Sequence, residues 1–260
     1  MKASPFGQQL RHWRAVRGMS QLSLASAING SARHLSFIET GRSRPGEDLV
    51  HRLADALGVP KRGRNELLLS AGFSPLYSEE PLEGPQLSRY RDLVERMLEK
   101  HRPYPATVID RAWVIRDANA AAQTLFGSTC VGRGAIDILW ELRDALENFD
   151  DVVLGSRQRL VEERFNNPDD SVLDDLIDRL DAMVAPKDPS PLKSPSSGSA
   201  IVTPRYRIGN QQVIETIMTV ARFSAASHLE LEELRVELIY PMDEGGERFF
   251  RSIDAPATCG

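Results

Sequence analysis

Residues 19–45 read MSQLSLASAINGSARHLSFIETGRSRP, and this stretch decides the fold of the N-terminal part of the chain. Two short helical patterns meet at Asn29-Gly30, where we expect the glycine to let the chain turn. Ser20 is placed to cap the first helix, Ser31 to cap the second, and Gly41 to end it. A helix, a tight turn and a second helix of this length form the arrangement that inserts one helix into the major groove of DNA.

Apolar residues at helical spacing predict three more helices around this pair. Gly58-Val59-Pro60 is a strong helix terminator and ends the fourth of the five helices, that over 47–57. The sequence therefore predicts a five-helix N-terminal domain, with helices over residues 6–17, 20–27, 31–40 and 47–57 and a last one that includes 65–71.

The side chains of the second helical pattern favour contact with bases. Arginine binds guanine at two points, and the alanine methyl group suits a thymine methyl group, so Arg33 and Ala32 are candidate base contacts. Gln21 begins the preceding helix and is expected to hold a phosphate. Glu39 is expected to be an internal salt-bridge or capping partner and not a base contact. The full set of predicted DNA contacts is Arg14, Arg17, Gln21, Ser31, Ala32, Arg33, His34, Ser36, Phe37, Arg42 and Arg44. The alternative is a small helical bundle that carries scattered surface arginines and binds no DNA.

Charge is distributed unevenly along the 260 residues. Residues 1–72 contain 11 Lys+Arg and five Asp+Glu, a net charge of +6, whereas the net charge of the whole chain is −5. A basic head on an acidic body suits a protein whose N-terminal part alone binds a polyanion.

The character of the sequence changes after a segment rich in proline and glycine, which predicts a linker over 75–86. An amphipathic helix is expected over 87–100. Two short apolar runs, 106–109 and 112–115, predict a strand, a tight turn and a second strand. Asn119 is expected to start an alanine-rich helix that Gly127 stops. Beyond it we expect mostly helix over 136–182, a loop over 186–199, strands over 201–208, 212–223 and 233–240, and a short helix over 246–253.

These motifs resemble those of a known family. Ser20–Ala25 and Phe37–Pro45 are similar to the Cro/C1-type (XRE) helix-turn-helix, which has a lambda-repressor-like fold. The chain more narrowly resembles the MmyB-like bacterial transcription regulators, and the segments that carry this resemblance are 33–39, 64–69, 71–73, 103–106, Asp110 with Trp113, 119–122 and 231–237. The resemblance implies an α+β, PAS-like C-terminal domain, which in some members encloses a fatty-acid-like ligand. The chain departs from the pattern in 186–199 and in an acidic stretch, 141–181.

A small domain with a sheet and helices on one side can hold an apolar ligand between the two layers. The candidate lining residues are Val108, Trp113, Ile115, Phe126, Ile138, Leu139, Leu142, Phe165, Ile217, Phe223 and Leu238. Each of these is equally an ordinary core residue of a solid domain. Three strand arginines, Arg205, Arg207 and Arg222, are able to pair with a carboxylate or to lie exposed.

The sequence contains little that supports an enzymatic function. The five histidines show no metal-ligand spacing, and there is no nucleophile elbow or phosphate-binding loop. We therefore predict no enzyme activity, no metal and no cofactor. Two cysteines and the absence of a signal peptide or an apolar run of membrane length favour a cytoplasmic protein.

Together these patterns predict a DNA-binding domain over 1–74, a linker over 75–86 and a ligand-binding and dimerisation domain over 87–260. The expected function is that of a homodimeric transcription regulator whose partners are an operator in double-stranded DNA and a small apolar, fatty-acyl-like effector. The alternative is a regulator whose C-terminal domain only dimerises or binds another protein, with no ligand.

Overall fold

The computed structural model describes residues 4–79, 84, 87–167, 170–184, 202–209, 212–224 and 227–254. They form two compact units, one made mainly of the chain before residue 80 and the other mainly of the chain after it. Each unit is built around its own buried apolar cluster.

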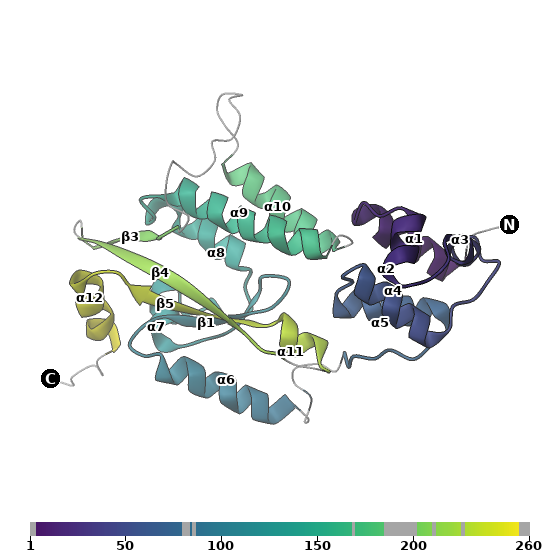
Figure 1. The fold of residues 1–260 in the computed structure, drawn as a ribbon. Helices are drawn as coiled ribbons and strands as arrows, with labels where there is room; N and C mark the ends of the chain where they lie inside the picture. Colours follow the sequence, from purple (N-terminus) through teal and green to yellow (C-terminus); the bar gives the residue numbers. More distant parts are fainter. Residues whose placement is uncertain are drawn as a thin grey trace. The chain divides into compact units, whose positions relative to one another are not determined.

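Within residues 4–79 the first unit contains five α-helices, as the sequence predicts (Figure 1). The last helix begins four residues earlier than the 65–71 pattern indicates, because Pro60 precedes it and supplies a fixed backbone angle at the N-cap. The helices are α1 (Pro5–Val16), α2 (Gln21–Ala27), α3 (Ala32–Glu39), α4 (Glu47–Ala56) and α5 (Lys61–Ala71).

The turn between α2 and α3 differs in detail from the prediction. The Ser20 hydroxyl accepts a hydrogen bond from the amide of Ser23 at 3.0 Å and so caps α2, as expected. Ser31 occupies the N-cap of α3 without a capping hydrogen bond from its side chain. The left-handed residue of the turn is Asn29, with φ +50°, and not Gly30. Asparagine tolerates this conformation because its short polar side chain has little steric conflict there.

The core of the helical unit fixes α3 against its neighbours. Leu24 of α2 and both Leu35 and Ile38 of α3 are completely or almost completely buried. Gly7 of α1 lies so close to the end of α3 that a Cβ atom there would come within 2.6 Å of the Glu39 carbonyl oxygen. The orientation of α3 is therefore set by close backbone packing as well as by apolar side chains.

The second unit is built on a sheet that is antiparallel throughout. Among the described residues it has five strands in the order β2-β1-β5-β4-β3 (Figure 1). At the centre of the sheet β1 pairs with β5, which lies far from it in the sequence, and Val108 is opposite Val236. The strands are β1 (Ala106–Ile109), β2 (Ile115–Ala118), β3 (Arg205–Ile208), β4 (Gln212–Arg222) and β5 (Arg235–Pro241).

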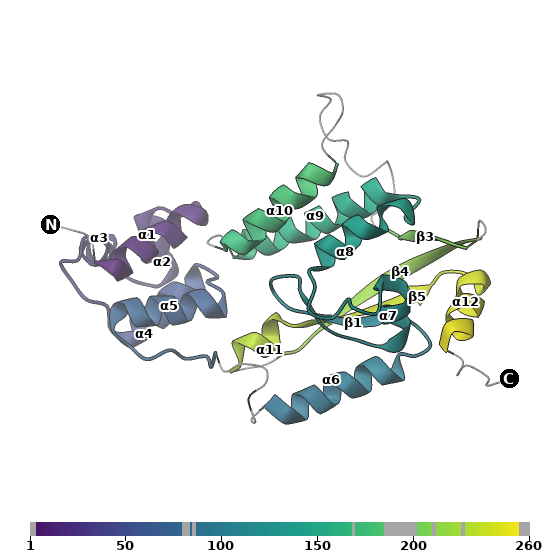
Figure 2. The same ribbon diagram turned by 180° about the vertical axis from the view of Figure 1, so that it is seen from behind.

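Helices cover both faces of this sheet, whereas the sequence led us to expect them on one side. Helices α8, α9 and α10 lie over one face, and α6 lies over the other (Figures 1 and 2). Helix α12 packs against α7 and β4. The helical elements are α6 (Ser88–Lys100), α7 (Ala120–Phe126), α8 (Ala135–Glu141), the short 3-10 helix η2 (Leu142–Asp144), α9 (Phe149–Asn166), α10 (Ser171–Met183), α11 (Leu229–Glu233) and α12 (Glu244–Asp254).

The second strand begins three residues later than the apolar run 112–115 indicates. The Asp110 carboxylate accepts hydrogen bonds from the amides of Ala112 and Val114, which folds this run into a turn. Trp113 has φ +59° within that turn. Its ring is thereby turned into the core, and it is 4 % exposed.

Two other predictions concern the helices of this unit and the loop beside them. Asn119 caps α7 by accepting from the amide of Ala122, and Gly127 follows the helix with φ +99°, as expected. The loop predicted over 186–199 and half of the predicted linker (residues 80–83, 85 and 86) lie outside the described residues.

Candidate DNA-binding surface and ligand cavity

The outer side of α3 is an open surface that carries basic side chains. Arg33 and His34, in its first turn, and Ser31, before it, are exposed. Ala32, Ser36 and Phe37 are partly exposed along the same helix. The base-contact candidates of the sequence therefore lie at the accessible N-terminal end of one helix, where backbone N–H groups also favour an anion.

The guanidinium groups of two arginines lie over the Phe37 ring on this surface. The Arg33 guanidinium carbon lies 5.5 Å from the centre of the Phe37 ring, and the Arg42 carbon lies 5.9 Å from it. A guanidinium is attracted to the face of an aromatic ring at such distances. Arg44 is also exposed, two residues further along the chain.

Arg14 and Gln21 have a partner inside the protein. Arg14 Nε donates to Glu39 Oε1 at 2.9 Å, and Gln21 Nε2 donates to Glu39 Oε2 at 2.7 Å. Glu39 is 1 % exposed, so the internal salt bridge expected for it is confirmed. These contacts connect α1 and α2 to the end of α3, and they give both residues a structural role; a phosphate contact by either one stays a prediction.

Arg17 also has internal partners. Its guanidinium donates to the carbonyl oxygens of Leu57 at 2.9 Å and Gly58 at 3.1 Å. These carbonyls belong to the C-terminal end of α4, where a positive charge stabilises the helix. A contact between Arg17 and DNA likewise stays a prediction.

A cavity of about 490 Å³ lies between the sheet and the helices α8 and α9 of the second unit. We call it the inner cavity. Its walls are mainly apolar and include Ile109 of β1, Ile138 of α8 and Met218 of β4. Its volume falls in the range of about 300–1,000 Å³ that is typical of small-molecule sites.

The structure brings five of the predicted ligand contacts to the inner cavity. These are Trp113, Ile115, Phe126, Ile138 and Leu139. Val108 lies on the opposite face of the sheet, and Leu142, the first residue of η2, packs against the core. Phe165 is 68 % exposed. Ile217, Phe223 and Leu238 are not among the lining residues.

Strand alternation explains why Ile217 and Leu238 do not line the cavity. Thr216 and Met218 line it from β4, and Glu237 and Ile239 line it from β5. Successive side chains of a strand point to opposite faces, so the residues between these pairs face the other side. Both faces are covered by helices, and the apolar pattern alone therefore does not indicate which one borders the cavity.

The lining of the inner cavity also contains charged side chains, which the sequence prediction missed. Arg159 and Glu237 both line the cavity, and Arg159 Nη1 donates to Glu237 Oε1 at 3.4 Å. Arg235 lies beside them and is 4 % exposed. Its guanidinium carbon is 4.4 Å from the centre of the Trp113 ring, and its Nη1 donates to Glu163 Oε1 at 2.5 Å. The sequence did contain an indication of these charges at the cavity, because Arg235 and Glu237 occupy alternate positions of the otherwise apolar strand β5.

Burial lowers the pKa of Arg235, and the negative charges of Glu163 and Glu237 act against this effect. An arginine keeps its proton at any physiological pH, so Arg235 remains a buried positive charge. Of the arginines proposed from sequence, Arg205 and Arg207 are exposed near Glu147. Arg222 is exposed too, but it pairs at 3.0 Å with Glu163, the carboxylate that also binds Arg235.

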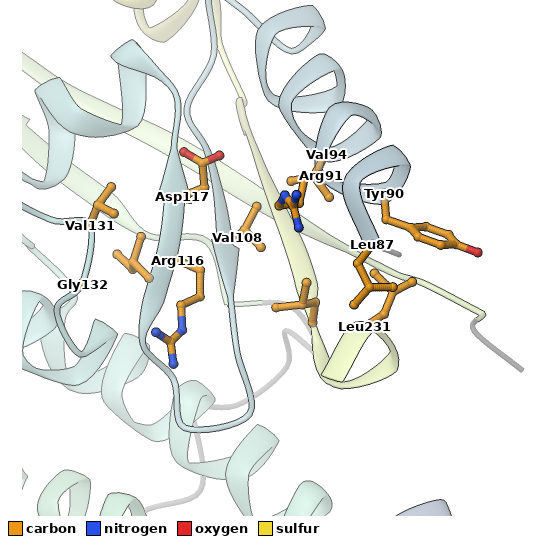
Figure 3. Close-up of a pocket in the computed structure, with 12 residues that line it drawn as sticks. Leu87, Tyr90, Arg91, Val94, Val108, Arg116, Asp117, Val131, Gly132 and Leu231 are labelled. Atoms are coloured by element: carbon orange, nitrogen blue, oxygen red, sulfur yellow. The ribbon is translucent and has the colours of Figure 1, made fainter. Parts of the chain in front are cut away.

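A second, smaller pocket of about 310 Å³ lies between α6 and the other face of the sheet. Figure 3 shows its side chains, with Tyr90 and Val94 from α6 and Leu87 just before α6 on one side, and Val108 from β1 on the other. Ile115 borders this pocket as well as the inner cavity. Tyr90 is 40 % exposed, and in Figure 3 its ring points away from the strands.

Within the described ranges, no group of three or more His, Cys, Asp or Glu side chains is arranged to hold a metal ion. Over the same ranges, every helix is too short or too polar to cross a membrane.

Two family models match the chain. A helix-turn-helix domain matches residues 5–67, and the ligand-binding domain of MmyB-like transcription regulators matches residues 90–253. The chain belongs to the MmyB-like transcription regulators. It is thus a helix-turn-helix, DNA-binding transcription regulator with an MmyB-like ligand-binding domain, and its family is one of regulators and not of enzymes. The resemblance inferred from the sequence is confirmed, as is the combination of a five-helix domain with an α+β domain.

Other comparisons add little to this assignment. No curated protein matches the chain. A solved structure titled "Structure of an RNA-binding Light-Oxygen-Voltage Receptor" is similar at 15 % identity with a TM-score of 0.27. The match covers 96 % of this chain and 62 % of that one, so the chain spans less than two thirds of that protein's length.

Proposed function

We propose that this MmyB-like regulator is a cytoplasmic homodimer that reads an operator with the N-terminal half of α3. The observation that carries the proposal is the exposure of Ser31, Arg33 and His34 at one end of a helix that is rigidly packed along its other side. Two such helices related by a two-fold axis would enter successive major grooves, so the half-sites would be centred about 34 Å apart.

We also propose that the inner cavity binds the effector, a small and mainly apolar molecule such as a fatty acid or another acyl compound. Its volume, its mainly apolar walls and the few charged side chains in its lining support a mainly apolar ligand with a polar group. The ligand would change the affinity for DNA to the extent that it binds the DNA-competent form of the dimer more or less tightly than the other form.

The first test is of the DNA contact. Preferred sequences are selected from a random duplex library with the full-length chain, and affinities for selected and random duplexes are measured by fluorescence anisotropy. Arg33→Ala is expected to cost about 1–3 kcal/mol on the selected DNA and to relax the preference at one position. Arg96→Ala removes an exposed arginine of α6 and controls for net charge.

An equal loss for Arg33→Ala on selected and random DNA would refute its assignment as a base contact. Sedimentation equilibrium at the same concentrations tests the dimer, which the proposal requires to be the DNA-bound species.

A further inference from the structure

The chain that follows α5 does not leave the helical unit at the end of that helix. Gly72 has φ +90° and ends α5, and the amide of Phe73 donates back to the Leu68 carbonyl oxygen at 2.9 Å. Phe73 also packs against the buried apolar cluster of the unit. This turn sends the chain back along α5, where a polar residue of the helix binds it.

That residue is Asn65, which is completely buried. Its Oδ1 accepts from the amides of Leu76 at 2.9 Å and Tyr77 at 3.0 Å. Its Nδ2 donates to the Tyr77 carbonyl oxygen at 2.8 Å and to Glu79 Oε1 at 3.3 Å. A side-chain amide offers two acceptor sites and two donors, and here residues 76–79 use all four. We call residues 76–79 the clamped segment.

Two charged residues of α5 also contact the clamped segment. Lys61 Nζ lies 5.3 Å from the centre of the Tyr77 ring, and Arg62 Nη1 lies 3.6 Å from Glu79 Oε2. The Glu79 side chain is half exposed, and ion pairs at such a surface contribute little. The attachment of the clamped segment to α5 therefore depends mainly on the buried amide of Asn65.

The clamped segment also pairs with chain that follows β4. The amide of Ser78 donates to the Ser227 carbonyl oxygen at 2.7 Å, and the amide of Leu229 donates to the Ser78 carbonyl oxygen at 3.0 Å. Ser227 and Leu229 belong to the same compact unit as α1–α5. A displacement of the clamped segment from α5 would therefore move this second stretch of chain as well.

The clamped segment decides where the chain leaves the helical unit towards α6. Seven residues, 80–86, separate it from Leu87, which directly precedes α6. Without the bonds from Asn65, residues 74–79 would be added to this connection. Six more residues extend its reach by about 20 Å, which is more than half of the roughly 34 Å between two half-sites of an operator.

Resting on the proposal that the chain reads an operator as a homodimer, we propose that Asn65 is a positioning residue that sets the half-site spacing which the dimer accepts. Asn65 is buried, so it acts through the clamped segment and not by contact with a base. A short connection lets the two α3 helices reach few spacings together, and the second half-site adds affinity only where the connection spans the distance. A longer connection accepts more spacings.

The test measures affinity against half-site spacing with the full-length protein. Duplexes carry one selected half-site, or two at the preferred spacing, or two at a spacing changed by about five base pairs, which turns one of them to the opposite side of the DNA. In fluorescence anisotropy, wild type is expected to bind the altered duplex at least about ten-fold more weakly than the preferred one. Asn65→Ala is expected to reduce this penalty to less than about three-fold, with its affinity for one half-site within about two-fold of wild type.

Ser70→Ala is the matched control on the same helix. The Ser70 hydroxyl donates to the Leu67 carbonyl oxygen within α5, so this variant leaves the clamped segment attached and is expected to keep the wild-type penalty. Hydrogen–deuterium exchange checks the cause: amides of the clamped segment should exchange faster in Asn65→Ala, whereas those of α1–α4 should not.

A second variant keeps the test decisive if Asn65→Ala fails to fold. Tyr77→Pro releases the clamped segment from the other side, because proline has no amide to donate to Asn65 and position 77 lies beyond the end of α5. It is expected to relax the spacing preference in the same way.

The outcomes separate this inference from the proposed function. If wild type binds two half-sites no more tightly than one at any spacing, the proposed dimer fails and the inference fails with it. If wild type binds two half-sites tightly at every spacing, or if a folded Asn65→Ala or Tyr77→Pro variant keeps the full penalty, the dimer stands and the inference is overturned. A loss of affinity for one half-site as large as the change for two would also overturn it, because Asn65 would then only support the fold of the helical unit.

Discussion

Replacing Glu39 by glutamine is predicted to destabilise the helical unit by about 3 kcal/mol. The Glu39 carboxylate joins three helices, because Arg14 of α1 and Gln21 of α2 both donate to it. A glutamine keeps the size but turns an NH₂ group toward one of these donors and leaves Arg14 without its counter-ion. Breaking a buried ion pair costs about 3–5 kcal/mol, and we expect the lower end because the Arg14 side chain is 19 % exposed and can be hydrated.

The same contact predicts a pH effect. Burial alone would raise the pKa of Glu39, but the hydrogen bonds from Arg14 and Gln21 and the charges of Arg14 and Arg11 outweigh it, so the pKa lies below its usual range. A lowered pKa contributes stability above the unfolded value of about 4.3, and this stability is lost as the pH falls through the folded value. Wild type should therefore weaken below about pH 4 in a step that Glu39→Gln lacks.

Hydrogen–deuterium exchange of peptides from α1–α5 in the full-length chain measures the local stability at pH 7. Glu47→Gln, at an exposed glutamate in the first turn of α4, is the matched control and is expected to change stability by less than about 0.5 kcal/mol. A double-mutant cycle with Arg14→Met should show coupling, because the two residues share one contact. The reasoning is wrong if Glu39→Gln costs no more than Glu47→Gln, or if the two single effects simply add.

Three further predictions concern the DNA surface and the second unit. Arg44→Ala, at an exposed arginine, should weaken binding to all duplexes alike and lower the slope of log affinity against log salt by about one; an unchanged slope would exclude a phosphate contact. Asn119→Ala should destabilise the second unit by at least about 3 kcal/mol in urea unfolding, and a loss below about 1 kcal/mol would contradict this. The reason is that the Asn119 side chain makes four hydrogen bonds to the backbone: it accepts from the amides of Ala106 and Ala122 and donates to the carbonyl oxygens of Leu98 and Tyr104. Phe37→Leu should reduce base preference less than Arg33→Ala does, because it removes only the ring that holds Arg33; an equal or larger loss in the anisotropy assay would indicate that Phe37 contacts DNA itself.

The helical unit was largely predictable because its signals are local. Apolar spacing, the cap at Ser20 and the glycine at Gly41 each act within one or two turns of helix, and the structure places helices where these signals do. The internal role of Glu39 was also expected. The partners of Glu39 were not, because nothing local shows that Arg14, 25 residues away, donates to it and is thereby drawn from the surface.

The second unit was harder to predict because its contacts are distant in sequence. Arg235 and Glu237 alternate with apolar residues in β5, which usually indicates a polar face in water. Here that face borders the cavity, since α9 brings Arg159 and Glu163 against it. The turn of Trp113 into the core likewise depends on Asp110, whose side chain replaces the strand pairing that the apolar run predicts.

The central claim is that the inner cavity holds the effector of this regulator, and organic extraction of the purified full-length chain followed by mass spectrometry tests it most directly. Ser156 of α9 lines the cavity and is 6 % exposed, so Ser156→Phe fills the cavity from its wall and serves as the comparison. We predict one small, mainly apolar molecule, such as an acyl compound, per chain in wild type and none in folded Ser156→Phe. A clean extract from folded wild type, or the same molecule in equal amount from the variant, would contradict the claim.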